Sequence, residues 1–406
     1  MDGPATDAVI GLPRSVFVDS VGNIFFSDAV LNRVLMIDTL GILREVAGDG
    51  FQGFAGDGFD ASRASFDRPA GIFVDRNGDV YVADRGNNRV RRMDAETRIV
   101  DTVAGSGGTL FDGDGALATI ANLDSPAGVF VDRNQNLFIA DRDHNRIRRV
   151  NAQTRRMTTV AGRESAGNVG DGGPATEAYL NRPISVVMDL EGNLYISDEG
   201  NLRVRKVDVD GIITTVAGAA VRYDFLGAAI GGFGGDGGPA TLALFNNMKD
   251  IFVDAGGNIY ICDENNNRVR RVDPKAIITT VAGDGWVDTD GGGRYTTDDV
   301  PATESSLNDP KGVFVDRSGN LIIADEDNNR IRMVVGIAAP TDVFAVSIPS
   351  ADFNGDGSVA FEDFLLFAGV FGLRSIDPPY DSKFDLDSSG EIGFGDFLLF
   401  AGQFGK

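Results

Sequence analysis

The 406-residue chain is poor in the side chains that build many catalytic and metal sites. It contains one cysteine (Cys262), one histidine (His144) and one tryptophan. A single cysteine excludes a disulfide framework and a thiolate zinc site within the chain, and a single histidine excludes sites that need several imidazoles. No apolar run approaches the roughly 18 residues that a membrane-spanning helix requires.

Positive charge is also scarce. The sequence has 37 Lys and Arg residues against 60 Asp and Glu residues, a formal net charge of −23 at pH 7. Because this balance repels phosphate backbones, we expect no nucleic-acid partner. Glycine is abundant instead, with 53 residues. Together with the length, this indicates a turn-rich protein of several domains or a repeat array.

A repeat accounts for most of the chain. Six segments align, among them "AGIFVDRNGDVYVADRGNNRVRRMD" and "KGVFVDRSGNLIIADEDNNRIRMVV". Each carries an Asp, a second Asp nine residues later and an Arg five residues after that; the first Asp stands at 19, 75, 132, 189, 254 and 316. Alternating β-branched and aromatic runs, separated by Asn-Gly or Gly-Asn turns, are typical of antiparallel strands joined by tight hairpins. Four such strands per unit predict one propeller blade, and six blades close a ring.

The repeat resembles the NHL-repeat family, whose blades carry the same succession of G-[hydrophobic]-D, G-N-L-Y-[VI]-A-D and N-x-R-[VI]. The resemblance implies an all-β, six-bladed β-propeller over residues 1–335, followed by a linker over 336–350. "DGPATDA" at 2–8 matches "DGGPATEA" at 171–178, and the sixth unit lacks its fourth strand. We therefore expect a fragment whose missing strand, and a signal peptide, lie upstream; "VFAVSIP" at 343–349 is the alternative source of that strand.

The repeated Asp and Arg residues are interpreted as structural, because a residue present in every blade is more economically a part of the blade than of a site. Asp84, for example, is expected to accept hydrogen bonds from turn amides and from Arg89. The "GDG" and "PAT" motifs between blades predict a tight turn followed by a short helix that begins at the proline. Calcium binding by these Asp residues is the alternative.

The lone cysteine and histidine are also interpreted as structural. Cys262 stands where other units carry Ser or Ala, which predicts a small buried strand residue, with a reactive thiol as the alternative. His144, which we align with Asn88 and Asn329, is predicted to be a turn residue, with a metal or general-base role as the alternative.

One face of the predicted ring is the expected binding face. It collects the turns between second and third strands and the long connections between blades, where a rigid scaffold presents variable loops. The residue after the second Asp changes sign from blade to blade, which predicts a charge-asymmetric mouth. Two longer connections add aromatic side chains. The candidates are Arg85, Arg142, Glu199, Glu264, Glu326, Tyr223, Trp286 and Tyr295.

The segment 351–406 departs from the repeat and contains two similar acidic loops. Ca²⁺ prefers oxygen ligands at positions 1, 3, 5, 7 and 12 of a twelve-residue loop. The first predicted site comprises Asp352, Asn354, Asp356, the Ser358 carbonyl and Asp363. The second, predicted to be weaker because Ser389 replaces an acidic ligand, comprises Asp385, Asp387, Ser389, the Glu391 carbonyl and Asp396.

These loops resemble a dockerin, the duplicated F-hand calcium module of secreted bacterial proteins. The resemblance implies a small all-α pair that binds two Ca²⁺ ions, an extracellular or cell-surface location and docking to a cohesin-like partner. Phe361, Glu362, Phe394 and Gly395 depart from the partner-contacting positions of dockerins, which puts the cohesin-like partner in doubt.

The leading interpretation is a secreted or surface-attached binding protein whose propeller recognises a protein or glycan ligand. Two alternatives stay open. The resemblance to dockerins allows an accessory component of polysaccharide-degrading machinery, and NHL-like propellers are similar to lactonases and lyases that hold a metal in the central channel. The single histidine disfavours a zinc lyase, whereas a calcium lactonase built from carboxylates remains conceivable.

We predict that the double substitution Asp352→Ala/Asp385→Ala abolishes calcium-induced folding of residues 351–406 and leaves the propeller intact, because each substitution removes the first ligand of a loop. Calcium titration followed by circular dichroism checks this. A titration curve unchanged from that of the wild type contradicts the ligand assignment.

Overall fold

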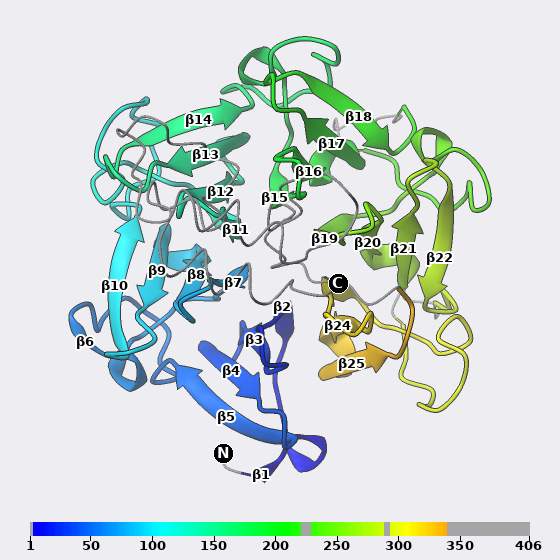
Figure 1. The fold of residues 1–406 in the computed structure, drawn as a ribbon, viewed down its shortest axis with the longest axis horizontal. Helices are drawn as coiled ribbons and strands as arrows, with labels where there is room; N and C mark the ends of the chain where they lie inside the picture. The colour runs from blue at the N-terminus through cyan, green and yellow to red at the C-terminus, as the bar shows by residue number, and fades with distance from the viewer. Residues whose placement is uncertain (1–2, 221–228, 288–292, 339–406) are drawn as a thin grey trace, which may run out of the picture. The chain divides into compact units, whose positions relative to one another are not determined.

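The computed structural model describes residues 3–220, 229–287 and 293–338, which lie within one compact unit ending at Val343. In the described part of the chain, six antiparallel sheets stand around a common axis, and their innermost strands are β2, β7, β11, β15, β19 and β23 (Figure 1). The predicted six-bladed all-β propeller is therefore confirmed. The calcium-loop segment and its predicted helices lie outside the described residues.

The first three blades follow the order of the sequence. Blade one contains β2 (Pro13–Val18), β3 (Ile24–Asp28), β4 (Arg33–Ile37) and β5 (Ile42–Ala47), with β1 (Gly3–Pro4) paired outside β5. Blade two contains β7 (Ile72–Val74), β8 (Val80–Asp84), β9 (Arg89–Met93) and β10 (Ile99–Ala104), with β6 (Phe59–Asp60) outside β10. Blade three contains β11 (Pro126–Val131), β12 (Leu137–Asp141), β13 (Arg146–Val150) and β14 (Met157–Ala161).

The other three blades repeat this arrangement. Blade four contains β15 (Pro183–Met188), β16 (Leu194–Asp198), β17 (Arg203–Val207) and β18 (Ile213–Ala217). Blade five contains β19 (Met248–Val253), β20 (Ile259–Asp263), β21 (Arg268–Val272) and β22 (Ile278–Ala282). Blade six has three strands among the described residues: β23 (Pro310–Val315), β24 (Leu321–Asp325) and β25 (Arg330–Val334).

Eight single-turn 3-10 helices lie in the described loops: η1 (Ala5–Asp7), η2 (Ala61–Arg63), η3 (Arg85–Asn87), η4 (Ala175–Glu177), η5 (Glu199–Asn201), η6 (Ala240–Leu242), η7 (Glu264–Asn266) and η8 (Glu326–Asn328). The short helices predicted at the "PAT" motifs are η1, η4 and η6. Each begins one residue later than expected, because Pro4, Pro174 and Pro239 are extended and precede the turn.

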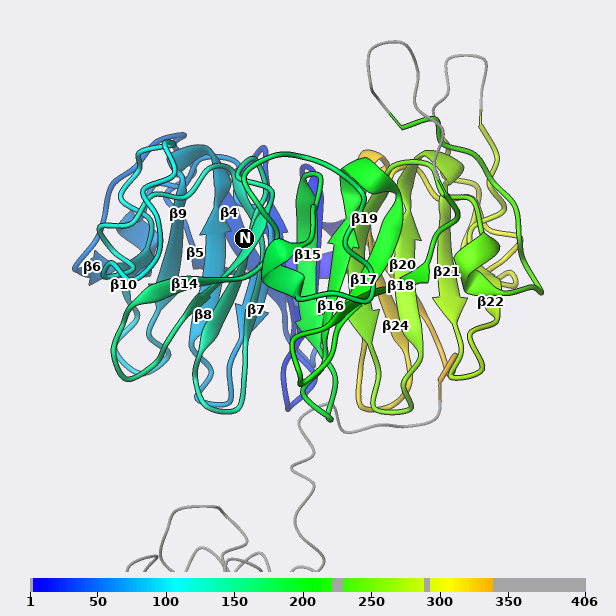
Figure 2. The ribbon, with the colours of Figure 1, turned by 90° about the horizontal axis from the view of Figure 1, so that it is seen from above.

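The first Asp of each repeat unit lies in the hairpin turn between the first two strands of its blade. Asp132, for example, accepts hydrogen bonds from the backbone amides of Asn134 (2.9 Å) and Asn136 (2.7 Å) and from the Asn136 side chain (2.8 Å). A carboxylate in this place satisfies turn amides that the ladder leaves free. These turns form one face of the ring, the hairpin face, which is the lower side in Figure 2.

The centre of the ring is packed by aromatic side chains from the innermost strands. Phe17 contacts Phe73 and Phe314 at centroid distances of 4.9 and 4.8 Å, and Phe252 contacts Phe314 at 4.4 Å. Near these rings, the segment leading into β7 lies very close to β11. A Cβ atom on Gly71 would lie 2.5 Å from the carbonyl oxygen of Ala127. Only a glycine fits such an approach.

A fully buried arginine ties the blade to the loop that precedes it. Arg205 of β17 lies between Asp198, at the end of β16 (3.4 Å), and Asp171 of a "GDG" loop (2.6 Å). Arg205 and Asp198 are both 0% exposed. The same arrangement recurs at the carboxylate–arginine–carboxylate triads Asp84–Arg91–Asp57, Asp141–Arg148–Asp114, Asp263–Arg270–Asp236 and Asp325–Arg332–Asp298.

This arrangement confirms a structural role for the repeated Asp but corrects its partner. Asp84 accepts from Arg91 and from the amide of Asp67, whereas Arg89 donates to backbone carbonyls and stacks on Phe54 at 3.8 Å. The expected partner was wrong because Arg91, two residues further along the same side of β9, is the fully buried arginine that reaches Asp84. Four of the "GDG" Asp residues, which are the alternative calcium ligands, are outer carboxylates of these triads: Asp57, Asp114, Asp171 and Asp236.

We predict that Arg205→Leu lowers the free energy of unfolding by about 3–5 kcal/mol, because it leaves Asp198 charged, buried and without its cation. A leucine fits this position of a blade, because Leu35 of blade one is the equivalent of Arg205: each pairs with the middle residue of the second strand. Lys206→Leu, which removes a half-buried charge from the same strand, should cost less than about 1 kcal/mol. Urea denaturation measures both, and equal losses contradict the triad's role.

Candidate functional site on the loop face

The five charged candidates lie together on the face opposite the hairpin turns, which we call the loop face. Each directly follows the last residue of the second strand of its blade, and four of them open a 3-10 turn. The fixed position arises because the buried Asp that ends the strand is bonded into the triad, while the next side chain leaves the blade. The charge-asymmetric mouth is therefore built at one position of the repeat, by Arg85, Arg142, Glu199, Glu264 and Glu326.

Three basic residues from the innermost strands complete this arrangement into an ion-pair chain. Lys249 and Lys311 each lie between two glutamates of neighbouring blades, and Arg14 ends the chain. In order the chain runs from Arg142 to Glu199 (3.3 Å), to Lys249, to Glu264 (3.2 Å from Lys249), to Lys311, to Glu326 (3.0 Å from Lys311) and to Arg14 (3.1 Å from Glu326).

The sequence reasoning missed Arg14, Lys249 and Lys311. They occupy the second residue of β2, β19 and β23, where blades two and three carry Ala70 and Ala127. A comparison of the six segments at this position would have shown the change from small to basic residues. What it could not have shown is that this strand start and the second strand's end meet at the mouth.

The ion-pair chain favours the charged form of Glu199. Burial by itself raises the pKa of Glu199, but Lys249 and Arg142 outweigh burial and the pKa is lowered. Glu199, Glu264 and Glu326 are all buried. A ligand therefore meets fixed charges of alternating sign, held in place before it binds.

A polar pocket adjoins the chain at blades four and five. Its volume is about 520 Å³. Its lining is dominated by side-chain amides and charges: Arg142, Asn181, Arg182, Glu199, Gly200, Leu202, Ala229, Asn246, Asn247 and Asn265. Amide groups both donate and accept, which suits hydroxyl-rich or peptide-like ligands.

Two of the aromatic candidates lie in the described loops. Arg330 stacks on Tyr295 at 3.9 Å, as Arg89 stacks on Phe54 in blade two, and the Tyr295 hydroxyl donates to Asp298 (2.9 Å). Trp286 is half-buried, with Arg294 over its ring at 4.3 Å. Tyr223 lies outside the described residues.

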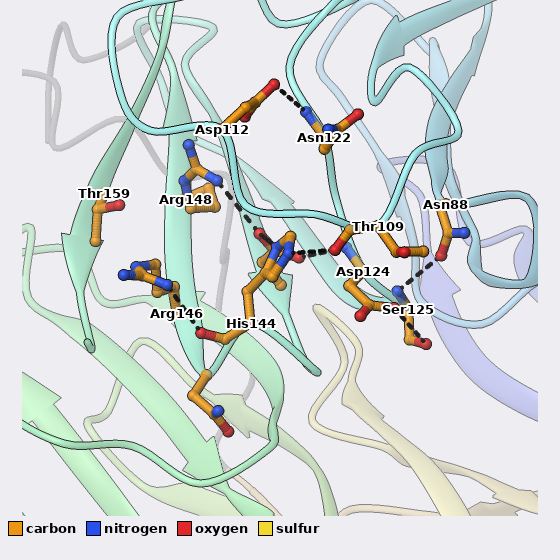
Figure 3. A network of polar contacts seen from close by, with 12 residues as sticks. Asn88, Thr109, Asp112, Asn122, Asp124, Ser125, His144, Arg146, Arg148 and Thr159 are labelled. Atoms are coloured by element: carbon orange, nitrogen blue, oxygen red, sulfur yellow. Dashed lines mark hydrogen bonds and ion pairs between the residues drawn. The ribbon is translucent and has the colours of Figure 1, made fainter. Parts of the chain in front are cut away.

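The only histidine is a buried part of its blade. Figure 3 shows His144 with Thr109 on one side, and its Nδ1 and Nε2 atoms lie 2.9 Å from an Asp141 carboxylate oxygen and 2.8 Å from the Thr109 carbonyl oxygen. Both partners are acceptors, so the cationic ring, in which both nitrogens donate, suits this geometry best. The expected alignment of His144 with Asn88 and Asn329 was wrong by one residue. His144 corresponds to Asn87 of blade two, whose side chain donates to Asp84 as the His144 ring does to Asp141.

Cys262 is fully buried in β20 and pairs in register with Val269, as expected for a small strand residue. Within the described ranges, no group of three or more His, Cys, Asp or Glu side chains is placed to hold a metal ion. The predicted calcium ligands all lie beyond those ranges. No helix in the described part of the chain is long and apolar enough to cross a membrane.

Comparison with known proteins gives the class of this fold. The NHL repeat model matches residues 66–93, most of blade two, and the teneurin NHL domain model matches residues 164–224, around blade four. The chain thus folds as a six-bladed propeller, and two of its segments match models of NHL repeats. It is 27% identical to NHL repeat-containing protein 2 of Bos taurus over 82% of this chain and 48% of the relative.

Two other relatives cover smaller shares of the chain. Teneurin-1 of Mus musculus is 31% identical over 54% of this chain, and Protein SUPPRESSOR OF QUENCHING 1 of Arabidopsis thaliana is 26% identical over 71%. The chain spans only 8% and 27% of these two proteins.

Two solved structures share the fold. A Bacteroides thetaiotaomicron protein of unknown function superposes with a TM-score of 0.59 at 21% identity, covering 82% of this chain and 72% of that one. An auxiliary nutrient binding protein of Bacteroides ovatus gives 0.57 at 16% identity, covering 82% and 71%.

We predict that the stabilising contribution of His144 is lost as the pH rises. Burial opposes its charge, but the hydrogen bond and charge of Asp141 outweigh burial and raise the pKa above the ordinary 6.5. A pKa raised in the folded state adds stability that is complete below the unfolded pKa and disappears as the pH rises through the folded one. Melting temperatures measured from pH 5 to 9 test this. His144→Asn, which supplies the donor that blade two uses, should lack this pH dependence; a parallel curve for the variant contradicts the assignment.

Proposed function

We propose that this protein is a binding protein whose propeller recognises a protein or glycan ligand on the loop face. The amide-rich pocket beside a buried chain of fixed charges carries the proposal. Such a site combines donors and acceptors with preset electrostatics on a rigid scaffold, which is the usual construction of a recognition surface. One protein of the same fold is described as an auxiliary nutrient binding protein, which agrees with a binding role.

The narrower proposal concerns attachment. We propose that residues 351–406 bind two Ca²⁺ ions and attach the propeller to a surface or to a cohesin-like partner outside the cell. Calcium loops of extracellular modules bind at about 10⁻⁴–10⁻³ M, which suits extracellular and not cytosolic calcium levels. In that setting the propeller would serve as an accessory, glycan-binding part of polysaccharide-degrading machinery.

The arrangement of the mouth favours binding over metal-dependent lactonase or lyase chemistry. Glu199, Glu264 and Glu326 are the acids of the ion-pair chain, and each is bonded to lysine or arginine side chains. A divalent cation could take these carboxylates as ligands only by displacing Lys249 and Lys311 from them. As they stand, the three glutamates are neutralised by the lysine and arginine side chains bonded to them.

We predict that Arg182→Ala/Asn265→Ala weakens binding of the ligand at least about tenfold, because both side chains line the pocket and reach solvent. The ligand is first found by screening the whole chain, with and without calcium, against polysaccharides and secreted proteins. The matched control, Arg76→Ala/Asn134→Ala, changes the same residue types at exposed turns of the hairpin face. Equal binding by both double variants contradicts the loop-face site.

A further inference from the structure

The ion-pair chain is open at blade two. It begins at Arg142 of blade three, passes through blades four, five and six and ends at Arg14 of blade one. Within it every glutamate lies between two cations, so that the two ends of the chain are both arginines. The gap between them is the place of blade two.

Arg85 stands in this gap without an acidic partner. It follows β8, and β8 packs against β11 of blade three. Within the described part of the chain, the Arg85 guanidinium makes no hydrogen bond or ion pair, although the side chain is only partly exposed. The corresponding residue of blade one is Ala29, so no carboxylate comes from that side.

The residues around Arg85 are small where other blades are large. Blades five and six place Lys249 and Lys311 at the second residue of the innermost strand, whereas blades two and three have Ala70 and Ala127 at the aligned positions. Blade two thus contributes the cation of Arg85 to the mouth, together with the small side chain of Ala70. The nearby Asp143 is already bonded to Arg142 (2.8 Å) and Arg182 (3.5 Å).

We propose that Arg85, flanked by Arg14 and Arg142, binds the oxyanion group, carboxylate or phosphate, of a small ligand. A guanidinium presents two parallel donors that match either group, and Arg85 is the arginine of this gap that has no carboxylate partner among the described residues, since Arg14 and Arg142 are paired with glutamates. The proposal rests on the loop face being the binding face, and it adds the chemical class that this face selects. In a chain of net charge −23 the gap is a local exception that attracts anions.

A partly buried arginine without a carboxylate partner lowers the stability of the protein itself. Burial, followed by the charges of Arg142 and Arg14, lowers the pKa of Arg85 to about 10. An arginine kept in this state without a carboxylate destabilises the fold unless an anion binds. Removing the charge should therefore leave the stability of the anion-free protein equal or higher, which a structural arginine would not do.

The test is titration calorimetry of the whole chain with inorganic phosphate and, separately, with glucuronate, against sodium chloride at matched ionic strength. We expect saturable binding of at least one of them, and Arg85→Gln should weaken it at least about tenfold. Arg85→Lys, which keeps the charge but loses the paired donors, should bind the anion with an affinity between those of the wild type and Arg85→Gln. Arg76→Gln, an exposed arginine on the hairpin face of the same blade, should bind as the wild type does.

Several outcomes overturn the proposal: no saturable binding of either anion, equal weakening by Arg85→Gln and Arg76→Gln, or a lower melting temperature of Arg85→Gln in chloride alone. The two proposals fail separately. If a screened ligand is lost in Arg182→Ala/Asn265→Ala but neither anion binds, the binding face stands and the oxyanion site is wrong. If the anions bind through Arg85 but the pocket variant has no effect on the screened ligand, the oxyanion site stands and the pocket is not the site of the screened ligand.

Discussion

The fold depends on a guanidinium buried between two carboxylates. In blade four Arg205 joins Asp198 at the end of one strand to Asp171 in the loop before the blade, and both Arg205 and Asp198 are sealed from solvent. Such a group is tolerated only when its charge is met and its donors are used, so it fixes three separate segments at once. Its repetition around the ring explains why long, glycine-rich connections return to the same place in successive blades.

Blade one shows what happens when this constraint is relaxed. Leu35 takes the place of the arginine, and Asp28 accepts instead from the amides of Gly11 (2.6 Å) and Leu31 (2.9 Å). The carboxylate is thus retained and its partners change. What is constant in all six blades is a buried acid that must be satisfied locally, and the arginine is the usual solution where a preceding loop has to be held.

The same constraint sets the position at which the molecule can vary. Because the Asp at the end of the second strand is fixed, the following residue always emerges on the loop face, near the axis. Its charge changes from arginine in blades two and three to glutamate in blades four to six, and lysines from the innermost strands neutralise the glutamates. A symmetric scaffold thus carries an asymmetric mouth, in which Arg85 alone lacks a counter-charge among the described residues.

The sequence by itself determined the number of blades, their strand order and the location of the variable face, because strand alternation, tight turns and a fixed spacing of Asp and Arg are local properties that repeat. It also located the sign changes at Arg85, Arg142, Glu199, Glu264 and Glu326. Only the tertiary structure decided the partners. Asp84 pairs with Arg91 and not with Arg89, and Lys249 and Lys311 join glutamates of neighbouring blades, because closing the ring brings together side chains that are tens of residues apart in the chain.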